Sequence, residues 1–407
     1  MDLNEWKEKI SLCIKCGSCL SVCPIYLETA KETLVARGKL ALLSGYFSDR
    51  LPANKEIYHL LSNCLLCGAC AENCPSGVKA EDLIQQGRSL LIEKVGAARG
   101  KKFLAKGILP FPDRLKTLRR GQNLLFKKVP EERGLKLRFS SDPKTWPALA
   151  QPFFLDRKAI PIHPGTVPSL TIGFFVGCTT NYLYPEIGGA ALKLISPIGK
   201  VILPEGQTCC GLPAFSLGDI KTARDLARKN VLAFTEGHLD AIVVACSSCA
   251  AHIKLEYPQL LADDPALLPK GQAFIQKVEE LSQFLCKQDI DLTPAHSLTP
   301  QTITFHDPCH AKRKLKISDE PRKLLRSVPG LTLVELEEHR CCGHGGLFNL
   351  SHPDLSNKIL EHPLTDLDRS NATVITTSCM ACLMQFKLGA QRTGRKVLVK
   401  HWTELMV

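Results

Sequence analysis

The spacing of apolar and polar positions divides the chain into a helical N-terminal part and a C-terminal part in which strands alternate with helices. Apolar residues recur at helical spacing in TLVARGKLALLSGYF (33–47) and AEDLIQQGRSLLIEKV (80–95). Further along, short apolar runs end in cysteine, as in LTIGFFVGC (170–178) and QTITFHDPC (301–309). Short apolar runs of this length predict buried strands. We therefore expect a multidomain α+β protein.

The strand-rich part of the sequence is duplicated. Three pairs of equivalent cysteines are separated by 131, 132 and 133 positions: Cys178 and Cys309, Cys209 and Cys341, Cys246 and Cys379. A nearly constant offset over three landmarks indicates an internal repeat. Helical patterns such as 219–237 and 354–370 lie between the landmarks. Strands that alternate with helices predict two small α/β domains, each with a parallel sheet.

Two cysteine motifs of identical spacing lie in the N-terminal part. CIKCGSCLSVCP (13–24) and CLLCGACAENCP (64–75) both read CxxCxxCxxxCP. In this spacing three thiolates bind one [4Fe–4S] cluster and the fourth cysteine binds the other cluster. The predicted ligand sets are Cys13, Cys16, Cys19 and Cys74 for the first cluster, and Cys23, Cys64, Cys67 and Cys70 for the second. Zinc is the alternative, but it does not explain the triplets that end in proline.

The long interval between the two motifs resembles the α-helical ferredoxin arrangement of the iron–sulfur subunits of succinate dehydrogenase and fumarate reductase. That resemblance implies that Arg37, Gly38 and Lys39 open a helix that separates the two cluster loops. The alternative is an ordinary helix start.

Ten further cysteines lie in the two repeats, five in each. They are Cys178, Cys209, Cys210, Cys246 and Cys249 in the first, and Cys309, Cys341, Cys342, Cys379 and Cys382 in the second. Five thiolates exceed the need of one cubane, and adjacent cysteines can bridge irons in a more open cluster. A zinc site, or a reduced set of cysteines without a cluster, remains open as an alternative. Cys286 stands alone, and we expect it to be a small buried apolar residue.

The spacing within each repeat, C-x(30–31)-CC-x(35–36)-C-x-x-C, resembles the cysteine-rich CCG domain of heterodisulfide reductase. In that family each full motif binds a noncubane [4Fe–4S] cluster that cleaves a disulfide. The whole layout resembles the glycolate oxidase iron–sulfur subunit family, with the phrases GCTTNYLYPEIG (177–188), HDPCH (306–310), CCGHGGLFNL (341–350) and HWTELM (401–406). The C subunit of anaerobic glycerol-3-phosphate dehydrogenase has the same layout.

Four segments follow from these motifs. We expect an α-helical ferredoxin domain at 1–95, a basic helical linker at 96–168, and CCG domains at 169–290 and 300–407.

The resemblance implies the iron–sulfur subunit of an oxidoreductase complex, not catalytic alone. It would pass electrons from an FAD-containing 2-hydroxyacid dehydrogenase subunit, of the glycolate or D-lactate type, to quinone or another redox acceptor. Two [4Fe–4S] clusters are implied, and one or two additional noncubane clusters in the CCG domains remain a hypothesis. The sequence has no Walker A, Rossmann GxGxxG or GxSxG motif, in agreement with electrons that come from another subunit. Because all ten CCG cysteines are present, one alternative is a heterodisulfide-reductase-like subunit that reduces a disulfide. The C subunit of an anaerobic glycerol-3-phosphate dehydrogenase is another alternative.

Charge and hydropathy add expectations about location. The net charge is +12, and residues 99–138 carry 13 Lys and Arg against three acidic residues. This segment is either a docking surface for an acidic partner or anionic lipid, or a solvated pair of connecting helices. No aromatic interleaving accompanies the charge, so nucleic acid is not expected. Without a secretory signal or a long apolar run, we expect a cytoplasmic protein, held peripherally on the inner face of the membrane if a partner recruits it.

Four histidines lie within five residues of cysteines in the second repeat: His306, His310, His339 and His344. They either tune a cluster through hydrogen bonds to sulfur and carry protons, or serve as structural residues. The sequence leaves both roles open. The glycines of GHGG (343–346) do not form a dinucleotide fingerprint, and we expect a tight turn beside Cys341 and Cys342.

Overall fold

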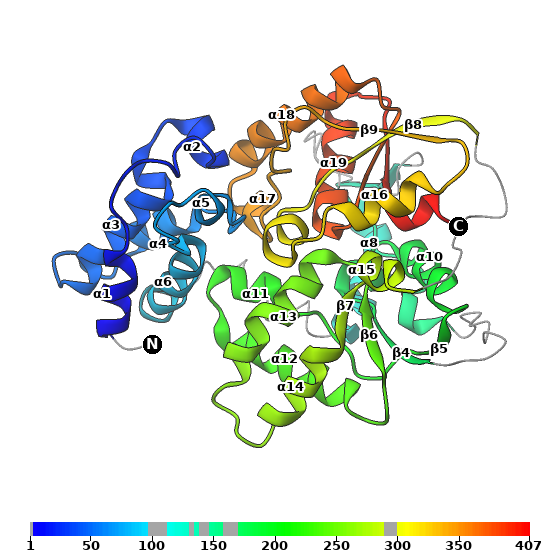
Figure 1. The fold of residues 1–407 in the computed structure, drawn as a ribbon, viewed down its shortest axis with the longest axis horizontal. Helices are drawn as coiled ribbons and strands as arrows, with labels where there is room; N and C mark the ends of the chain where they lie inside the picture. The colour runs from blue at the N-terminus through cyan, green and yellow to red at the C-terminus, as the bar shows by residue number, and fades with distance from the viewer. Residues whose placement is uncertain (1–2, 97–111, 130–133, 138–145, 158–169, 289–298) are drawn as a thin grey trace.

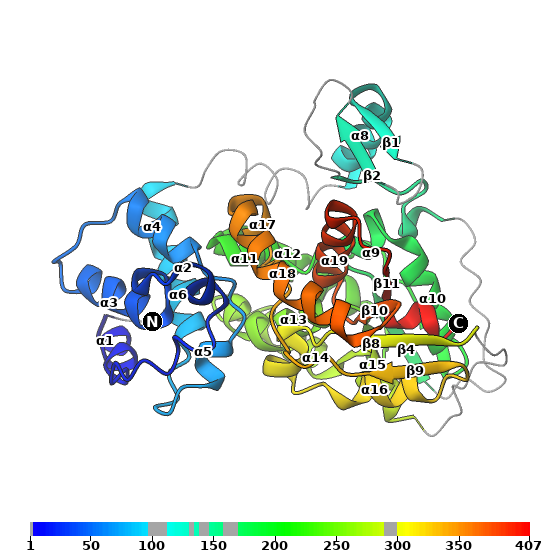
Figure 2. The same ribbon diagram turned by 90° about the horizontal axis from the view of Figure 1, so that it is seen from above.

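The computed structural model describes residues 3–96, 112–129, 134–137, 146–157, 170–288 and 299–407. A helical domain at the N-terminus lies beside two α/β units (Figure 1). A small helix and antiparallel sheet from the basic segment lie at one side of these units (Figure 2).

The N-terminal domain is entirely helical in its described part. Its elements are α1 (Leu3–Ser11), α2 (Pro24–Thr29), the 3-10 turn η1 (Glu32–Leu34), α3 (Ala36–Phe47), α4 (Lys55–Ser62), α5 (Ala69–Glu72) and α6 (Ala80–Val95). Helix α4 begins where Asn54 Oδ1 accepts a hydrogen bond from Ile57 N at 2.8 Å, which satisfies one free amide at the helix start. Gly87 lets α6 pack closely on α3, because a Cβ there would lie 2.5 Å from Leu43 Cδ2. The helices predicted at 33–47 and 80–95 are confirmed as α3 and α6.

The basic segment is only partly helical. Helix α8 (Pro112–Leu125) is followed by strands β1 (Phe126–Val129), β2 (Gly134–Leu137) and β3 (Trp146–Pro147), which form an antiparallel sheet in the order β1-β2-β3. The expectation of a helical linker is therefore wrong for these strands. Alternation of apolar and charged residues in GLKL has the period of a strand and not of a helix. Part of the predicted basic surface, including residues 99–111, lies outside the described residues.

The two repeats form two parallel four-stranded sheets of the same topology. The first contains β4 (Leu170–Phe175), β5 (Gly199–Ile202), β6 (Ala241–Val244) and β7 (Val278–Glu280) in the order β5-β4-β6-β7. The second contains β8 (Gln301–Phe305), β9 (Leu331–Val334), β10 (Val374–Thr377) and β11 (Leu398–His401) in the equivalent order β9-β8-β10-β11. Every pairing in both sheets is parallel. The duplication and the parallel α/β sheets expected from the sequence are confirmed.

Helices cover both faces of each sheet. In the first repeat they are α9 (Cys178–Tyr182), α10 (Pro185–Ile195), α11 (Leu212–Leu217), α12 (Ile220–Phe234), α13 (Ser247–Leu261), α14 (Leu268–Lys277) and α15 (Leu281–Cys286). In the second they are the π-helical turn η4 (His310–Leu315), α16 (Asp319–Arg326), α17 (Phe348–Ser351), α18 (Pro353–Ser370), α19 (Met380–Thr393) and the 3-10 turn η5 (Trp402–Leu405).

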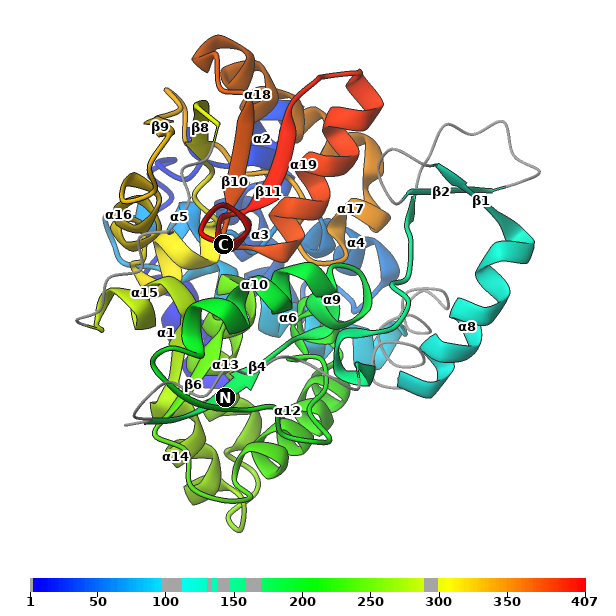
Figure 3. The ribbon, with the colours of Figure 1, turned by 90° about the vertical axis from the view of Figure 1, so that its right-hand side faces the viewer.

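The two repeats pack as one body around shared apolar cores. Helix α15, which follows the last strand of the first repeat, packs on α16 of the second. In the equivalent way η5, which follows the last strand of the second repeat, packs on α10 of the first (Figure 3). One core joins Val176, Val243, Ile303 and Trp402 from both repeats. This reciprocal packing places equivalent ends of the two sheets close together.

Candidate iron–sulfur centres

The first predicted ferredoxin site lies in the loop between α1 and α2. Cys13, Cys19 and Cys74 are half-buried against the apolar core of the helical domain, whereas Cys16 is exposed. Cys74 belongs to the second motif, and its neighbour Asn73 donates from Nδ2 to Ser18 O at 2.7 Å. This bond holds the end of the second motif against the first loop, in the crossed arrangement that the spacing predicts.

The second predicted ferredoxin site is a buried pocket. All four predicted ligands, Cys23, Cys64, Cys67 and Cys70, line this one pocket. Burial raises the pKa of Cys67 to about 12, so a cation is needed to hold its thiolate. The structure therefore brings together the ligand set predicted from two distant motifs.

Helix α3 lies between the two ferredoxin sites and contributes a basic side chain to each. Arg37 and Lys39 lie in its first turn, as the resemblance implied. Arg37 Nη1 donates to Lys15 O in the first loop at 3.2 Å. Lys39 is 1% exposed, lines the pocket of the second site, and its Nζ donates to Leu34 O. Burial lowers the pKa of Lys39, and the neighbouring cysteines oppose this shift.

Two further cations reach the second site, and sequence reasoning missed both. Arg88 is buried on α6, and its Nη2 donates to Cys64 O at 2.6 Å and to Leu61 O at 2.8 Å. Arg313, from the second repeat, donates from Nη1 to Cys67 O at 3.4 Å. Arg88 is 24 residues from Cys64 and Arg313 is 246 residues from Cys67, so the local sequence does not predict either contact.

The cysteines of the first repeat gather at the carboxyl end of its sheet. Cys178 is the first residue of α9 after β4, Cys209 and Cys210 follow β5, and Cys246 and Cys249 lie at the start of α13 after β6. Strand order reverses here, between β4 and β6, and α/β folds bind ligands at such switch points. Hydrogen bonds from Cys209 and Cys249 lower the pKa of Cys210 to about 6.

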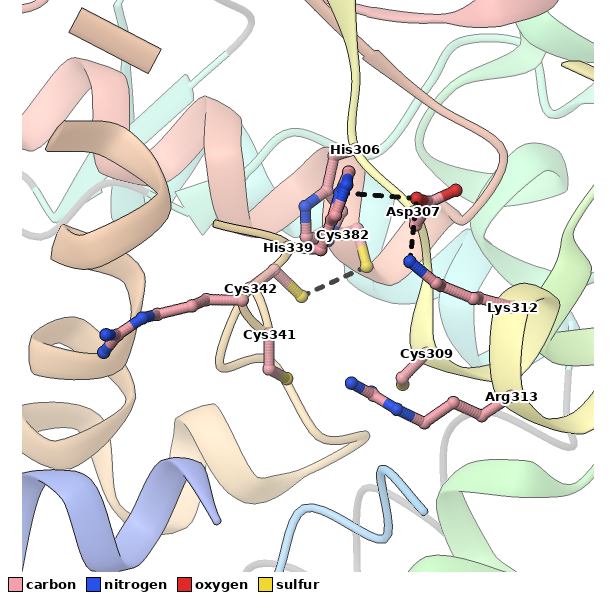
Figure 4. Close-up of a pocket in the computed structure, with 10 residues that line it drawn as sticks. His306, Asp307, Cys309, Lys312, Arg313, His339, Cys341, Cys342 and Cys382 are labelled. Atoms are coloured by element: carbon pink, nitrogen blue, oxygen red, sulfur yellow. Dashed lines mark hydrogen bonds and ion pairs between the residues drawn. The ribbon is translucent and has the colours of Figure 1, made fainter. Parts of the chain in front are cut away.

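The second repeat places its five cysteines in the equivalent positions. Cys309, Cys341, Cys342 and Cys382 converge on one pocket (Figure 4). Cys379 precedes α19, as its N-cap residue. Cys342 Sγ and Cys382 Sγ lie 3.1 Å apart. Hydrogen bonds from Cys341 and Cys382 lower the pKa of Cys342 to about 6, which repeats the behaviour of Cys210.

The two repeat sites meet at the interface between the repeats. The thiols of Cys246 and Cys379 face each other across it, and each shifts the pKa of the other. Ser248 Oγ lies 3.0 Å from Cys379 Sγ, and Ser247 N donates to Ser378 O at 3.0 Å. The ten thiols form one series in which each influences the pKa of the next: Cys178, Cys209, Cys210, Cys249, Cys246, Cys379, Cys382, Cys342, Cys341 and Cys309.

The second repeat also contacts the loop of the second ferredoxin site. Cys67, Cys309 and Cys341 belong to the same apolar cluster. The side chain of Arg313 spans this junction, because its Nε donates to Glu72 Oε2 at 3.0 Å while its Nη1 reaches Cys67 O. The turn at 343–346 packs on Leu65, and its three glycines have positive φ, as expected of a tight turn. The series of thiols therefore continues from the repeats into the ferredoxin domain.

The four histidines noted in the sequence lie around the second-repeat site. Burial lowers the pKa values of His306, His310 and His344 to about 4, so these side chains are neutral at pH 7. His339 is half-exposed, with Nδ1 3.5 Å from Asp307 Oδ2. His252 on α13 is a buried histidine that sequence reasoning missed; burial lowers its pKa to about 3.

Cys286 differs from the other cysteines. It is half-buried against the apolar core that the two repeats share, and its thiol donates to Glu320 O at 3.6 Å instead of to another cysteine.

The donor sets fit iron–sulfur clusters. Thiolates are the ligands that iron in such clusters uses, and each described site offers four or five cysteines. Burial raises the pKa values of thiols such as Cys67 and Cys70, so a bound cation is what would hold them in the charged form.

Two family models match the chain. The 4Fe-4S dicluster domain matches residues 9–78, and the cysteine-rich domain matches residues 172–254 and 303–387. These matches include both ferredoxin motifs and, in each repeat, the three strands before the last strand of the sheet, at least in part.

Full-length relatives agree with the domain matches. A protein of Bacillus subtilis strain 168, described as a probable glycolate oxidase iron–sulfur subunit, is 30% identical over 99% of this chain and 96% of its own length. The chain belongs to the family of glycolate oxidase iron–sulfur subunits. The glycolate oxidase iron–sulfur subunit of Escherichia coli K12 is 26% identical over 97% of this chain and 92% of its own length. One of the subunits of the fumarate reductase (CoM/CoB) of Methanothermobacter marburgensis is 28% identical over 95% of this chain and 69% of its own length.

A solved structure shares the fold. The crystal structure of a hypothetical protein from Helicobacter pylori superposes with a TM-score of 0.51 at 10% identity, over 91% of this chain and 67% of the other. Within the described residues of this family member, no helix has both the length and the apolar character needed to cross a membrane.

Proposed function

We propose that this chain is the iron–sulfur electron-transfer subunit of a flavin-dependent 2-hydroxyacid dehydrogenase complex of the glycolate or D-lactate type. It receives electrons from an FAD-containing subunit and delivers them to quinone or another acceptor. The observation that carries the proposal is the continuous series of thiols from the second ferredoxin site to Cys178. Relatives named glycolate oxidase iron–sulfur subunit and lactate utilization protein A support the choice of a hydroxy acid.

The ligand assignment is part of this proposal. Cys13, Cys16, Cys19 and Cys74 hold one [4Fe–4S] cluster; Cys23, Cys64, Cys67 and Cys70 hold the second; and each set of five repeat cysteines holds one further cluster. Bound clusters supply one-electron redox chemistry. The chain itself supplies thiolates, excludes water by burial and places cations beside the sites. Lys39 and Arg88 do so at the second ferredoxin site.

The ends of the series define where partners gain access. At one end the series adjoins the first ferredoxin site, where Cys16 is exposed. At the other, Cys178 is half-buried beside an apolar cluster of Leu115, Phe153 and Tyr182, to which the basic helix α8 contributes. An electron donor and an acceptor can therefore approach opposite ends. Attachment to a membrane surface through the basic segment belongs to the same proposal.

Anaerobic purification tests the cluster content. Two cubanes alone give about eight irons per chain, and four loaded sites give about sixteen with equal sulfide. We expect the higher value. A fully anoxic preparation without acid-labile sulfide would overturn the proposal.

Substrate-driven reduction tests the electron source. The chain is combined with a purified FAD-containing 2-hydroxyacid dehydrogenase subunit, and glycolate or D-lactate is added under anoxic conditions. We expect the iron–sulfur absorbance to bleach only when the flavoprotein is present. If neither acid bleaches the centres while dithionite does, the assignment to hydroxyacid oxidation is wrong.

A second function is favoured by the complete cysteine sets in both repeats, which suit a heterodisulfide-reductase-like subunit. In that case the protein alone, supplied with a reduced viologen, cleaves a disulfide to two thiols by two-electron reduction. Appearance of free thiols above a control without protein would favour this function over the first.

A further inference from the structure

The two repeats differ at one position beside their cysteine sites. His306 and Phe175 both stand three residues before the first cysteine of their repeat, at the carboxyl end of equivalent strands. Phe175 is fully buried and stacks on Phe234 with ring centroids 5.7 Å apart. The first repeat therefore has an apolar ring where the second has an imidazole.

The imidazole of His306 lies against two sulfurs of the second-repeat site. A ring nitrogen of His306, Cys342 Sγ and Cys382 Sγ all lie within 4.8 Å of one another. His306 is 3% exposed, and Figure 4 shows its ring beside Cys382 and Cys342. Three donors at this separation can bind a common metal centre after small side-chain movements.

The fold holds this ring in place. The backbone N of His306 donates to Thr376 O at 2.8 Å, which extends the pairing of β8 with β10 to this residue. The ring packs edge-on against Phe386, with centroids 4.8 Å apart. Burial also keeps the imidazole neutral, which is the form that binds metal.

We propose that His306 is an iron ligand of the second-repeat centre, together with Cys342 and Cys382. The proposal rests on the proposed function, because it requires an iron–sulfur cluster in this repeat. The second-repeat centre then has a mixed sulfur and nitrogen ligand set, whereas the first has thiolates alone. Histidine ligation raises the reduction potential of iron–sulfur centres, so the two equivalent centres differ in potential.

Nitrogen hyperfine coupling tests the ligand directly. The full chain is produced anaerobically with ¹⁵N-labelled histidine, reduced, and studied by pulsed EPR. We expect a strong coupling typical of directly bound nitrogen in the wild type. His306→Phe, which copies the first repeat, loses this coupling and lowers the occupancy of the centre at least twofold. His306→Cys restores the occupancy without the nitrogen coupling.

His339→Gln is the matched control, because His339 lines the same pocket but is half-exposed. It should retain the coupling. A loaded wild-type centre that shows only weak dipolar nitrogen coupling overturns the ligand assignment. So does a coupling that is lost in His339→Gln and kept in His306→Phe. Neither result affects the cluster content proposed for the repeats. Parallel iron and sulfide counts that show two cubanes and no further cluster overturn both this proposal and the cluster content proposed for the repeats.

Discussion

At the scale of single residues, the two ferredoxin sites differ in their charged neighbours. The first has an exposed cysteine, and Arg37 reaches its loop from α3. The second is buried and is contacted by Lys39, Arg88 and Arg313. Positive charge in a buried site stabilises the reduced, more negative form of a cluster. The second cubane should therefore have the higher reduction potential.

Replacing Lys39 by methionine removes this charge while keeping the length of the side chain. We expect the potential of the second cubane to become more negative by at least about 59 mV, a tenfold change for one electron. Lys39→Arg keeps the charge and should shift the potential much less. EPR-monitored redox titration measures both variants. An unchanged potential in Lys39→Met would show that the ammonium does not act on the cluster.

Cys19→Ser tests the ligand set of the first cubane. The variant should lose about four irons per chain and its share of the EPR signal, because three thiolates cannot replace the missing one. Cys286→Ser is the control, since Cys286 bonds to a backbone oxygen and not to other cysteines. Equal iron in Cys19→Ser and wild type, measured by colorimetric iron assay, would contradict the assignment.

At the scale of elements, the sequence predicted those features that depend on local pattern. Strands β4 and β8 were predicted from apolar runs that end at Cys178 and Cys309. The strands after α8 were not, because short segments in a basic, proline-dotted stretch have little periodicity. The neighbouring positions of Cys246 and Cys379 were also not predictable, since they depend on tertiary packing. Helix α15 of the first repeat packs on the second repeat, and η5 of the second packs on the first.

The start of α15 carries a pH-dependent contribution to stability. Glu280 is fully buried, and its Oε2 accepts from Ser282 N at 2.8 Å and from Gln283 N at 3.3 Å. Burial raises its pKa to about 7 from 4.5. The folded state therefore binds the proton more tightly than the unfolded state. The stabilising contribution is complete below pH 4.5 and is lost as the pH rises through 7.

Glu280→Gln should remove this dependence. Between pH 5 and pH 8 the free energy of unfolding of the wild type should fall by up to about 3 kcal/mol more than that of the variant. Urea denaturation followed by circular dichroism at both pH values gives the difference. Glu279→Gln, at the next position, should behave as the wild type. Parallel pH profiles for the wild type and Glu280→Gln would refute the assignment.

At the scale of the whole molecule, the junction between the ferredoxin domain and the second repeat determines whether the thiol series is continuous. Arg313 holds this junction through Glu72 and the backbone oxygen of Cys67, from a side chain that is 19% exposed. The corresponding position in the first repeat is Tyr182, which packs on Phe153 instead, with ring centroids 5.0 Å apart. The duplication therefore gives only the second repeat this contact.

Arg313→Met should slow electron transfer between the two halves without emptying their sites. Loss of the guanidinium leaves Glu72 and the Cys67 carbonyl without this donor. The lost hydrogen bonds cost about 1–3 kcal/mol of stability at the junction, which becomes less tightly held. We expect a fall of at least tenfold in the rate at which reduced cubanes pass electrons to the repeat centres. Rapid-freeze EPR measures this rate. Lys312→Gln is the control, because Lys312 lines the same pocket but pairs with Asp307 at 3.6 Å. If both variants keep the wild-type rate at unchanged iron content, electrons do not cross at Arg313, and the order of sites proposed for this molecule must be revised.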